Sequence, residues 1–69
     1  MTTYTAYDDQ DPTNHWAGRT LEQALAECSD KAAPWAVMTD DDYAVMMSGV
    51  NFQARVGNDG VTRITRIIK

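Results

Sequence analysis

The sequence has a single cysteine, Cys28, and this scarcity excludes two ways of stabilising a small domain. One thiol cannot form an internal disulfide, and it cannot supply the ligands of a cysteine-rich zinc site. A lone thiol is more typical of a reducing cytoplasm than of an oxidising compartment. We therefore expect an intracellular fold that depends on apolar packing and on backbone hydrogen bonds.

Long apolar runs and a targeting segment are also lacking. No stretch approaches the roughly 20 apolar residues that are needed to span a bilayer. The first residues, MTTYTAYDD, contain neither the basic region nor the apolar region of a signal peptide. With 69 residues, the chain fits one small domain, residues 1–69, with a thin core and no membrane partner.

Basic residues are few in the first part of the chain, so the charges are divided unevenly. Residues 1–42 carry nine acidic and two basic side chains, which gives −7, whereas residues 43–69 carry one acidic and four basic side chains, which gives +3. The acidic excess argues against nucleic-acid binding by the whole surface. It favours a basic partner, such as a protein that normally holds phosphates.

Three segments are expected in the first half of the chain. Residues 2–7, TTYTAY, combine threonine with tyrosine, which favours a short strand. Residues 8–18, DDQDPTNHWAG, are rich in turn-forming residues and contain Pro12, so we predict a loop. Thr20 and Gln23 have the spacing of a capping box at the start of a helix, and the apolar stripe of that helix consists of Leu21, Ala24, Leu25 and Cys28.

The stretch WAVMTDDDYAVM, residues 35–46, repeats the pattern aromatic-Ala-Val-Met on either side of three aspartates. In one interpretation, the two copies are paired strands of a hairpin and the aspartates form its turn. In the other, Thr39 caps a helix that ends at Gly49, and the aspartates lie in the first turn, where the helix dipole favours anions. Both interpretations of Tyr43–Met47 stay open, and the repeat favours the hairpin.

The last part of the chain is typical of a β-hairpin. Residues 52–56 and 61–68 alternate apolar and polar side chains, and the GNDG turn lies between them. Arg63 and Arg66 fall on opposite faces of a regular strand, which predicts a bulge or an edge exposed on both faces. Together, the segments predict an α+β fold in which one helix packs on a small antiparallel β-sheet, in the order strand, helix, meander.

Patterns of catalysis and metal binding are missing. His15 and Cys28 are the only candidates for a nucleophile and its base, and Cys28 falls on the apolar stripe of the helix. The runs DDQD and TDDD lack the alternating carboxylates, central glycine and distal glutamate of calcium loops. GNDG has neither the length nor the lysine of a phosphate-binding loop. We therefore expect no catalytic residue, no metal site and no cofactor, in a protein that is not an enzyme.

Acidic side chains and one tryptophan are the candidates for contact with a partner. Carboxylates can pair with lysine and arginine side chains that otherwise hold phosphates, and aromatic residues in loops are typical of binding hot spots. Trp35 is instead expected to anchor the core. The competing interpretation is a solvated surface that only confers solubility. If three acidic groups converge on one surface, the partner-binding residues are Asp8, Asp9, Asp11, Trp16, Glu27, Asp30, Asp40, Asp41 and Asp42.

The opening MTTYTAYDD, the capped helix TLEQALAEC and the small terminal β-meander, in a short acidic chain, resemble the small phage- and mobile-element-encoded anti-CRISPR proteins, especially inhibitors of type I systems. That group shares no common motif, so the resemblance assigns no residue a role by position. It implies a non-enzymatic inhibitor in the cytoplasm of a bacterial host cell. Such a DNA mimic would bind a basic nucleic-acid-handling protein, a subunit of a type I CRISPR effector, and would block the binding of DNA to the effector. The inhibitor would not bind nucleic acid.

Two other hypotheses stay open. A small phage regulatory or nucleic-acid-binding module would use the basic C-terminal hairpin, with Arg55, Arg63, Arg66 and Lys69. A dimeric accessory phage protein would use no acidic recognition. The sequence leaves the oligomeric state undetermined.

Overall fold

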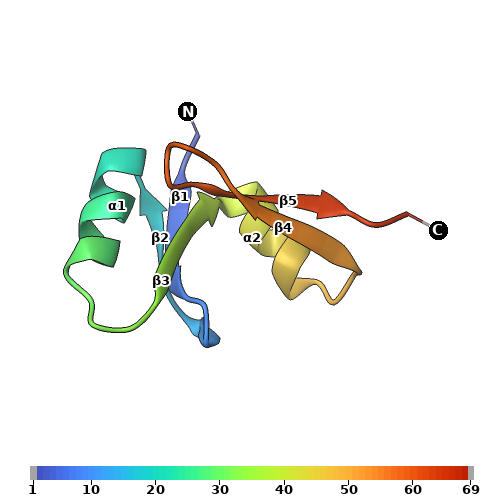
Figure 1. Ribbon diagram of the computed structural model, residues 1–69, viewed down its shortest axis with the longest axis horizontal. Helices are drawn as coiled ribbons and strands as arrows, with labels where there is room; N and C mark the ends of the chain where they lie inside the picture. Colours follow the sequence, from blue (N-terminus) through green and yellow to red (C-terminus); the bar gives the residue numbers. More distant parts are fainter. Residues whose placement is uncertain (1, 69) are drawn as a thin grey trace.

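The computed structural model describes residues 2–68 and shows an α+β fold, which confirms the fold class that the sequence predicts (Figure 1). Strands β1, β2 and β3 form an antiparallel sheet in the order β2-β1-β3, and β4 pairs with β5 in a separate two-stranded ribbon. We call residues 4–39 the N-terminal body and residues 52–66 the terminal ribbon. The elements are β1 (Tyr4–Asp8), β2 (Asp11–Arg19), α1 (Leu21–Ser29), β3 (Trp35–Thr39), α2 (Asp40–Met47), β4 (Phe52–Val56) and β5 (Thr62–Arg66).

The three-stranded sheet packs against a helix on each face. Neighbouring side chains of a strand point to opposite faces, so β1 contributes to both contacts. Ala6 of β1 is fully buried on the face of α1, where it clusters with Ala24, Val37 and Val61. The next residue, Tyr7, points to the other face, and its ring lies 5.8 Å from the ring of Tyr43 in α2. The sheet is therefore the middle layer of the molecule, as its position between the helices in Figure 1 shows.

The predicted loop over residues 8–18 is wrong, because most of it forms strand β2. Among the described strands, β2 pairs only with β1, so it is an edge strand. Pro12 can therefore lie in it although proline has no N–H for a ladder. The register between β1 and β2 shifts twice, and these irregularities accommodate the turn-forming residues. The turn itself consists only of Asp9 and Gln10.

The predicted helix is confirmed as α1. The Thr20 hydroxyl accepts a hydrogen bond from the Gln23 N–H, and the Gln23 side chain accepts one from the Thr20 N–H, so both bonds of the capping box form. The apolar stripe packs on the sheet as expected: Ala24 is fully buried, and Leu21, Leu25 and Cys28 are partly buried against the core.

The favoured hairpin over residues 35–47 is wrong, and the helical alternative for its second half is right. Residues 35–39 form strand β3, but residues 40–47 form helix α2. The Thr39 hydroxyl accepts a hydrogen bond from the Asp42 N–H at 3.1 Å, and all three aspartates lie in the first turn. Gly49, with φ of 83°, follows the C-cap residue Ser48 and reverses the chain.

The terminal ribbon confirms the predicted strands and the turn between them. Its register runs from Phe52 opposite Arg66 to Val56 opposite Thr62 without a shift, so the ribbon has no bulge and both arginines of β5 are exposed. A parallel bridge between Val37 and Val61 joins the ribbon to the edge of β3. The strands after the first helix are therefore divided between two sheets and do not form one meander. None of the helices described in residues 2–68 is long and apolar enough to cross a membrane.

Candidate functional site

Two of the three acidic groups lie at the same end of the N-terminal body. Asp8 stands opposite Trp35 in the register of β1 and β3, so the β1–β2 turn and the start of β3 are neighbours. The Asp9 N–H donates to the Pro34 carbonyl at 3.1 Å, which ties the turn to the loop that follows α1. Asp30 begins that loop as the C-cap of α1. The β1–β2 turn and the loop after α1 lie at the bottom of Figure 1. We call the surface at this end of the body the acidic end and define it by Asp8, Asp9, Asp11, Trp16, Asp30, Lys31 and Trp35.

The carboxylates of the β1–β2 turn are fixed by short local hydrogen bonds. Asp8 accepts from the Gln10 N–H at 3.0 Å, and Asp11 accepts from the Thr13 hydroxyl at 2.5 Å. Asp9 and Asp11 are exposed. Burial raises the pKa of Tyr7, and the charge of Asp9 raises it further. The local hydrogen bonds therefore restrain the carboxylates of Asp8 and Asp11, and the backbone of Asp9 is held by Pro34.

Two tryptophans and a lysine lie beside these carboxylates. The rings of Trp16 and Trp35 are 4.6 Å apart between centroids at an interplanar angle of 52°, a tilted aromatic pair. The Lys31 ammonium lies 4.2 Å from the centroid of Trp16 and 5.7 Å from that of Trp35, so it makes cation–π contacts with both rings. The indole Nε1 of Trp35 is buried and has no hydrogen-bond partner among residues 2–68.

Lys31 and Trp35 are members of this cluster that the sequence did not identify as site residues. Trp35 was expected in the core, but it is only partly buried. Lys31 is one of only two basic residues in the acidic first part of the chain. Its spacing of four positions from Trp35 is the one sequence signal that could have identified Lys31. The contact with Trp16 depends on the strand register, which the sequence does not reveal.

The third acidic group lies at the opposite end of the sheet, so the three groups do not converge. Thr39, just before α2, stands opposite Tyr4, and the length of β1, about 13 Å at roughly 3.3 Å per residue, separates this end from Asp8. Asp40 accepts hydrogen bonds from the hydroxyls of Thr3 and Thr5, the latter at 2.6 Å. Asp42 likewise accepts a hydrogen bond from the Ile64 N–H at 3.4 Å. Two of the three aspartates in this group therefore have structural roles.

An open pocket of about 270 Å³ lies next to the third acidic group. Its lining consists of Thr2, Thr3, Thr39, Asp40 and Asp41. Asp41 is the exposed carboxylate of this set, since that of Asp40 is engaged by two threonine hydroxyls. Within residues 2–68, no group of three or more His, Cys, Asp or Glu side chains is arranged to hold a metal ion.

Glu27 is the remaining predicted site residue, and it is engaged within the body. Its carboxylate lies 4.0 Å from the Arg19 guanidinium, and both side chains are partly exposed. An ion pair of this kind contributes little to stability, but it compensates part of the negative charge on α1. Glu27 is therefore a weaker candidate for partner contact than Asp30.

His15 and Cys28 do not form a catalytic pair. His15 lies on the α2 face of the sheet, where its ring is 4.9 Å from that of Tyr43. Cys28 lies on α1, on the other face, packed against the core. Burial raises the pKa of the Cys28 thiol, and the charge of Glu27 raises it further, so the reactive thiolate is disfavoured.

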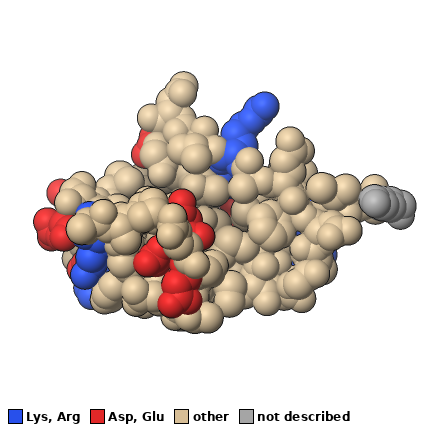
Figure 2. Space-filling view, turned by 60° about the horizontal axis from the view of Figure 1, so that its bottom comes forward, with Lys and Arg blue, Asp and Glu red and all other residues tan. Residues whose placement is uncertain are grey.

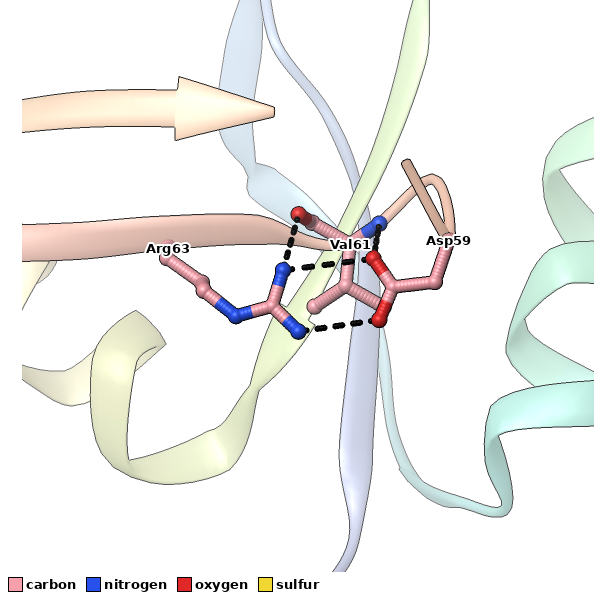
Figure 3. Close-up of polar contacts among 3 residues, drawn as sticks. All are labelled: Asp59, Val61 and Arg63. Carbon is pink, nitrogen blue, oxygen red and sulfur yellow. Dashed lines mark hydrogen bonds and ion pairs between the residues drawn. The ribbon is translucent and has the colours of Figure 1, made fainter. Parts of the chain in front are cut away.

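The basic side chains of the terminal ribbon are partly used within the ribbon. Arg63 donates to both carboxylate oxygens of Asp59, at 3.2 and 2.9 Å, and to the Val61 carbonyl, as Figure 3 shows. The hydrogen bond from Arg63, followed by that from the Val61 N–H, lowers the pKa of Asp59 to about 2. Arg55 lies opposite Arg63, whereas Arg66 points to the other face. The ribbon therefore offers no concentrated basic patch within its described residues.

Acidic side chains gather on one half of the face that Figure 2 shows. Figure 2 shows acidic side chains in groups over the half opposite the C-terminus, and a largely uncharged surface toward the C-terminus. The acidic end thus combines exposed and locally hydrogen-bonded carboxylates with an aromatic pair that already holds one cation. This arrangement suits the lysine and arginine side chains of a partner. Comparisons with protein families, curated proteins and solved structures found no match to this chain.

Proposed function

We propose that the protein is a non-enzymatic inhibitor that binds a basic, nucleic-acid-handling protein through its acidic end. The observation that carries this proposal is the position of the Asp8–Asp11 turn and Asp30 beside the Trp16–Trp35 pair, at one end of the sheet. Following the resemblance to anti-CRISPR proteins, we take a subunit of a type I CRISPR effector as the partner. The bound inhibitor would occupy the surface that receives DNA.

The chemistry of the acidic end explains how such a partner would be recognised. Arginine and lysine side chains that bind phosphates also pair with carboxylates, and arginine stacks on tryptophan. Lys31 already lies over Trp16, so the ring accepts a cation in this environment. A partner's arginine could take the place of Lys31 or lie on the other side of the aromatic pair. The surrounding carboxylates would accelerate the encounter through long-range attraction.

A pull-down from bacterial lysate that contains type I effector complexes tests the proposal. The tagged protein is expected to recover an effector subunit at low salt and to lose it progressively as salt screens the charges. A purified effector complex that fails to bind at low salt, and that still binds its DNA in the presence of the protein, would contradict the proposal.

Charge-matched variants then locate the contact. Asp9→Asn with Asp11→Asn removes two exposed charges at the acidic end, whereas Glu22→Gln with Asp41→Asn removes two exposed charges at the opposite end. The first pair should weaken binding at least about tenfold, mainly through slower association, and the second should change it by less than about threefold. Equal weakening by both pairs would mean that net charge alone is recognised and that the acidic end is not the contact.

A further inference from the structure

One edge of the terminal ribbon has no partner in the described chain. The hydrogen bonds from the Gly57 N–H to the Val61 carbonyl and from the Ile67 N–H to the Asn51 carbonyl mark the two ends of the ladder between β4 and β5. Because hydrogen-bonded pairs alternate along an antiparallel ladder, the backbone groups of Phe52, Ala54 and Val56 point away from β5. These three residues form the open edge of β4.

The other edges of the molecule are protected, and the edge of β4 is not. Edge strand β2 contains Pro12 and two register shifts, which hinder pairing with another chain. The outer edge of β5 faces the body, since Val61 bridges to Val37 and the Ile64 N–H donates to Asp42. β4 has a regular register, no proline and no such cover.

The exposed large apolar side chains belong to the last part of the chain, and one of them lies on β4. Among the described residues, the large hydrophobic side chains that are exposed all follow α1 and β3 in the chain: Met47, Val50, Val56, Ile67 and Ile68. Val56, at 69% exposed, lies on β4 itself. An exposed apolar side chain on a regular open strand is typical of an edge that another strand covers.

We propose that β4 pairs antiparallel with β4 of a second copy of this chain, so that the two ribbons form one four-stranded sheet. The sequence of β4, Phe-Gln-Ala-Arg-Val, is complementary to itself in the register that pairs all five residues. With the two-fold axis at Ala54, Phe52 of one copy faces Val56 of the other. Arg55 then faces Gln53, so no like charges stand directly opposite each other.

The alternative registers are less favourable. Moving the two-fold axis to Arg55 places two arginines opposite each other, and moving it to Gln53 leaves Val56 without a partner within β4. The register centred on Ala54 also pairs the residues whose N–H and C=O groups point outward, which gives about six new backbone hydrogen bonds. The acidic end lies on the N-terminal body and remains exposed in such a dimer, so this inference does not depend on the proposed function.

A charge-swap experiment at Ala54 tests both the dimer and its register. Ala54 is exposed, and in this register it faces Ala54 of the second copy, so Ala54→Lys or Ala54→Glu alone places like charges opposite each other. By sedimentation equilibrium, the native chain should be a dimer, each variant alone should dissociate at least about tenfold more readily, and an equimolar mixture should recover the native affinity. Recovery in the mixture also shows that both variants fold.

Matched substitutions elsewhere on the ribbon serve as the control. Thr65 is exposed on β5, which lies away from the new interface, so Thr65→Lys and Thr65→Glu should leave the dimer unchanged. A native chain that stays monomeric at millimolar concentration would overturn the proposal. So would a dimer that the Ala54 substitutions leave intact, since the two copies would then associate through another surface.

Discussion

Two strands of the N-terminal body and both strands of the terminal ribbon have the same length but differ in what covers them. β1 and β3 of the body and β4 and β5 of the ribbon are each five residues long. Three of the five residues of β1 are buried, whereas none of β4 is. β1 lies in the middle of its sheet between two helices, while β4 has one neighbouring strand and an open edge within residues 2–68.

This difference shows that an alternating apolar pattern specifies a strand but does not ensure its burial. Both units depend on the same backbone hydrogen bonding, yet only the body provides layers on both faces of its sheet. The charges follow a similar division, because the body carries six of the ten acidic residues and the ribbon carries three of the six basic residues. We infer that the body provides the stability and the recognition surface, and that the ribbon provides an edge for association.

The largest expected contrast comes from the same substitution in the two units. Val37 in β3 is 1% exposed and Val56 in β4 is 69% exposed. Val37→Ala should lower the free energy of unfolding by about 2–3 kcal/mol, through lost burial and a residual cavity, out of a total of about 3–10 kcal/mol for a chain of this size. Val56→Ala should change it by less than about 0.5 kcal/mol in the monomer.

Urea denaturation followed by circular dichroism measures both values. The concentration should be kept low enough that the chain is monomeric, so that association does not contribute. If Val37→Ala proved no more destabilising than Val56→Ala, the buried bridge between Val37 and Val61 would not anchor the fold, and the contrast between the two units would fail.

A second contrast separates structural from exposed carboxylates in α2. Asp40→Ala removes the carboxylate that accepts hydrogen bonds from two threonine hydroxyls. Because Thr5 is buried, its hydroxyl would be left without a partner, and the free energy of unfolding should fall by about 1–3 kcal/mol. Asp41→Ala removes an exposed charge from the same turn and should cost less than about 1 kcal/mol. Thermal denaturation of the two variants side by side makes this measurement. Equal losses would indicate that only the helix dipole matters.

A smaller effect is expected at the aromatic cluster of the acidic end. Lys31→Gln removes the cation from the faces of Trp16 and Trp35 and should lower the free energy of unfolding by about 0.5–1 kcal/mol. Lys31→Arg keeps the cation and should be nearly neutral. Tryptophan fluorescence during chemical denaturation reports on both the stability and the environment of the rings. Identical spectra and stabilities for the glutamine and arginine variants would show that the lysine contact has no energetic role.

The smallest effect concerns the pH response of the ribbon turn. The pKa of Asp59 is lowered to about 2 in the fold, from an ordinary value of 3.8, chiefly by hydrogen bonds from Arg63 and the Val61 N–H. A carboxylate with a lowered folded pKa contributes stability above its unfolded pKa and loses it as pH falls through the folded value. The turn should therefore stay ordered at pH 4 and loosen toward pH 2.

NMR titration of the Asp59 carboxylate and the Val61 amide follows this transition directly. The midpoint should lie near 2 in the native chain and move toward 3.8 in Arg63→Gln. Arg55→Gln, which removes a charge from the opposite strand without touching this hydrogen-bonded pair, should leave the midpoint close to its native value. A midpoint near 3.8 in the native chain would show that the pair seen in Figure 3 does not persist in solution.

The sequence predicted those elements whose signals are local. The Thr20 capping box, the apolar stripe of α1 and the GNDG turn each involve residues a few positions apart, and each is confirmed. The α+β class follows from them. Strand β2 was missed because its proline and turn-forming residues suggested a loop. Such residues are tolerated in an edge strand, and the position of β2 at the edge follows from the pairing of the other strands.

The remaining errors arose where long-range contacts decide the outcome. The repeated Ala-Val-Met phrase favoured two strands. In the structure, Asp40 contacts Thr3 of the N-terminal segment and the Thr39 hydroxyl caps α2, so the second copy lies in a helix that starts directly after β3. The acidic groups were identified residue by residue, but their grouping depends on which end of the sheet each one reaches. Lys31 and Trp35 were missed as site residues for the same reason, because their contact with Trp16 depends on how the strands pair.

Hydrogen–deuterium exchange of the chain, alone and with the type I effector complex recovered in the pull-down, is the most direct test of the acidic end as the recognition surface. Binding should slow exchange at the Asp8–Asp11 turn and across the loop of residues 30–34, and should leave the first turns of α1 and α2 unchanged. Slowed exchange at those first turns with no change in the β1–β2 turn would contradict the account. The acidic end would then serve solubility alone.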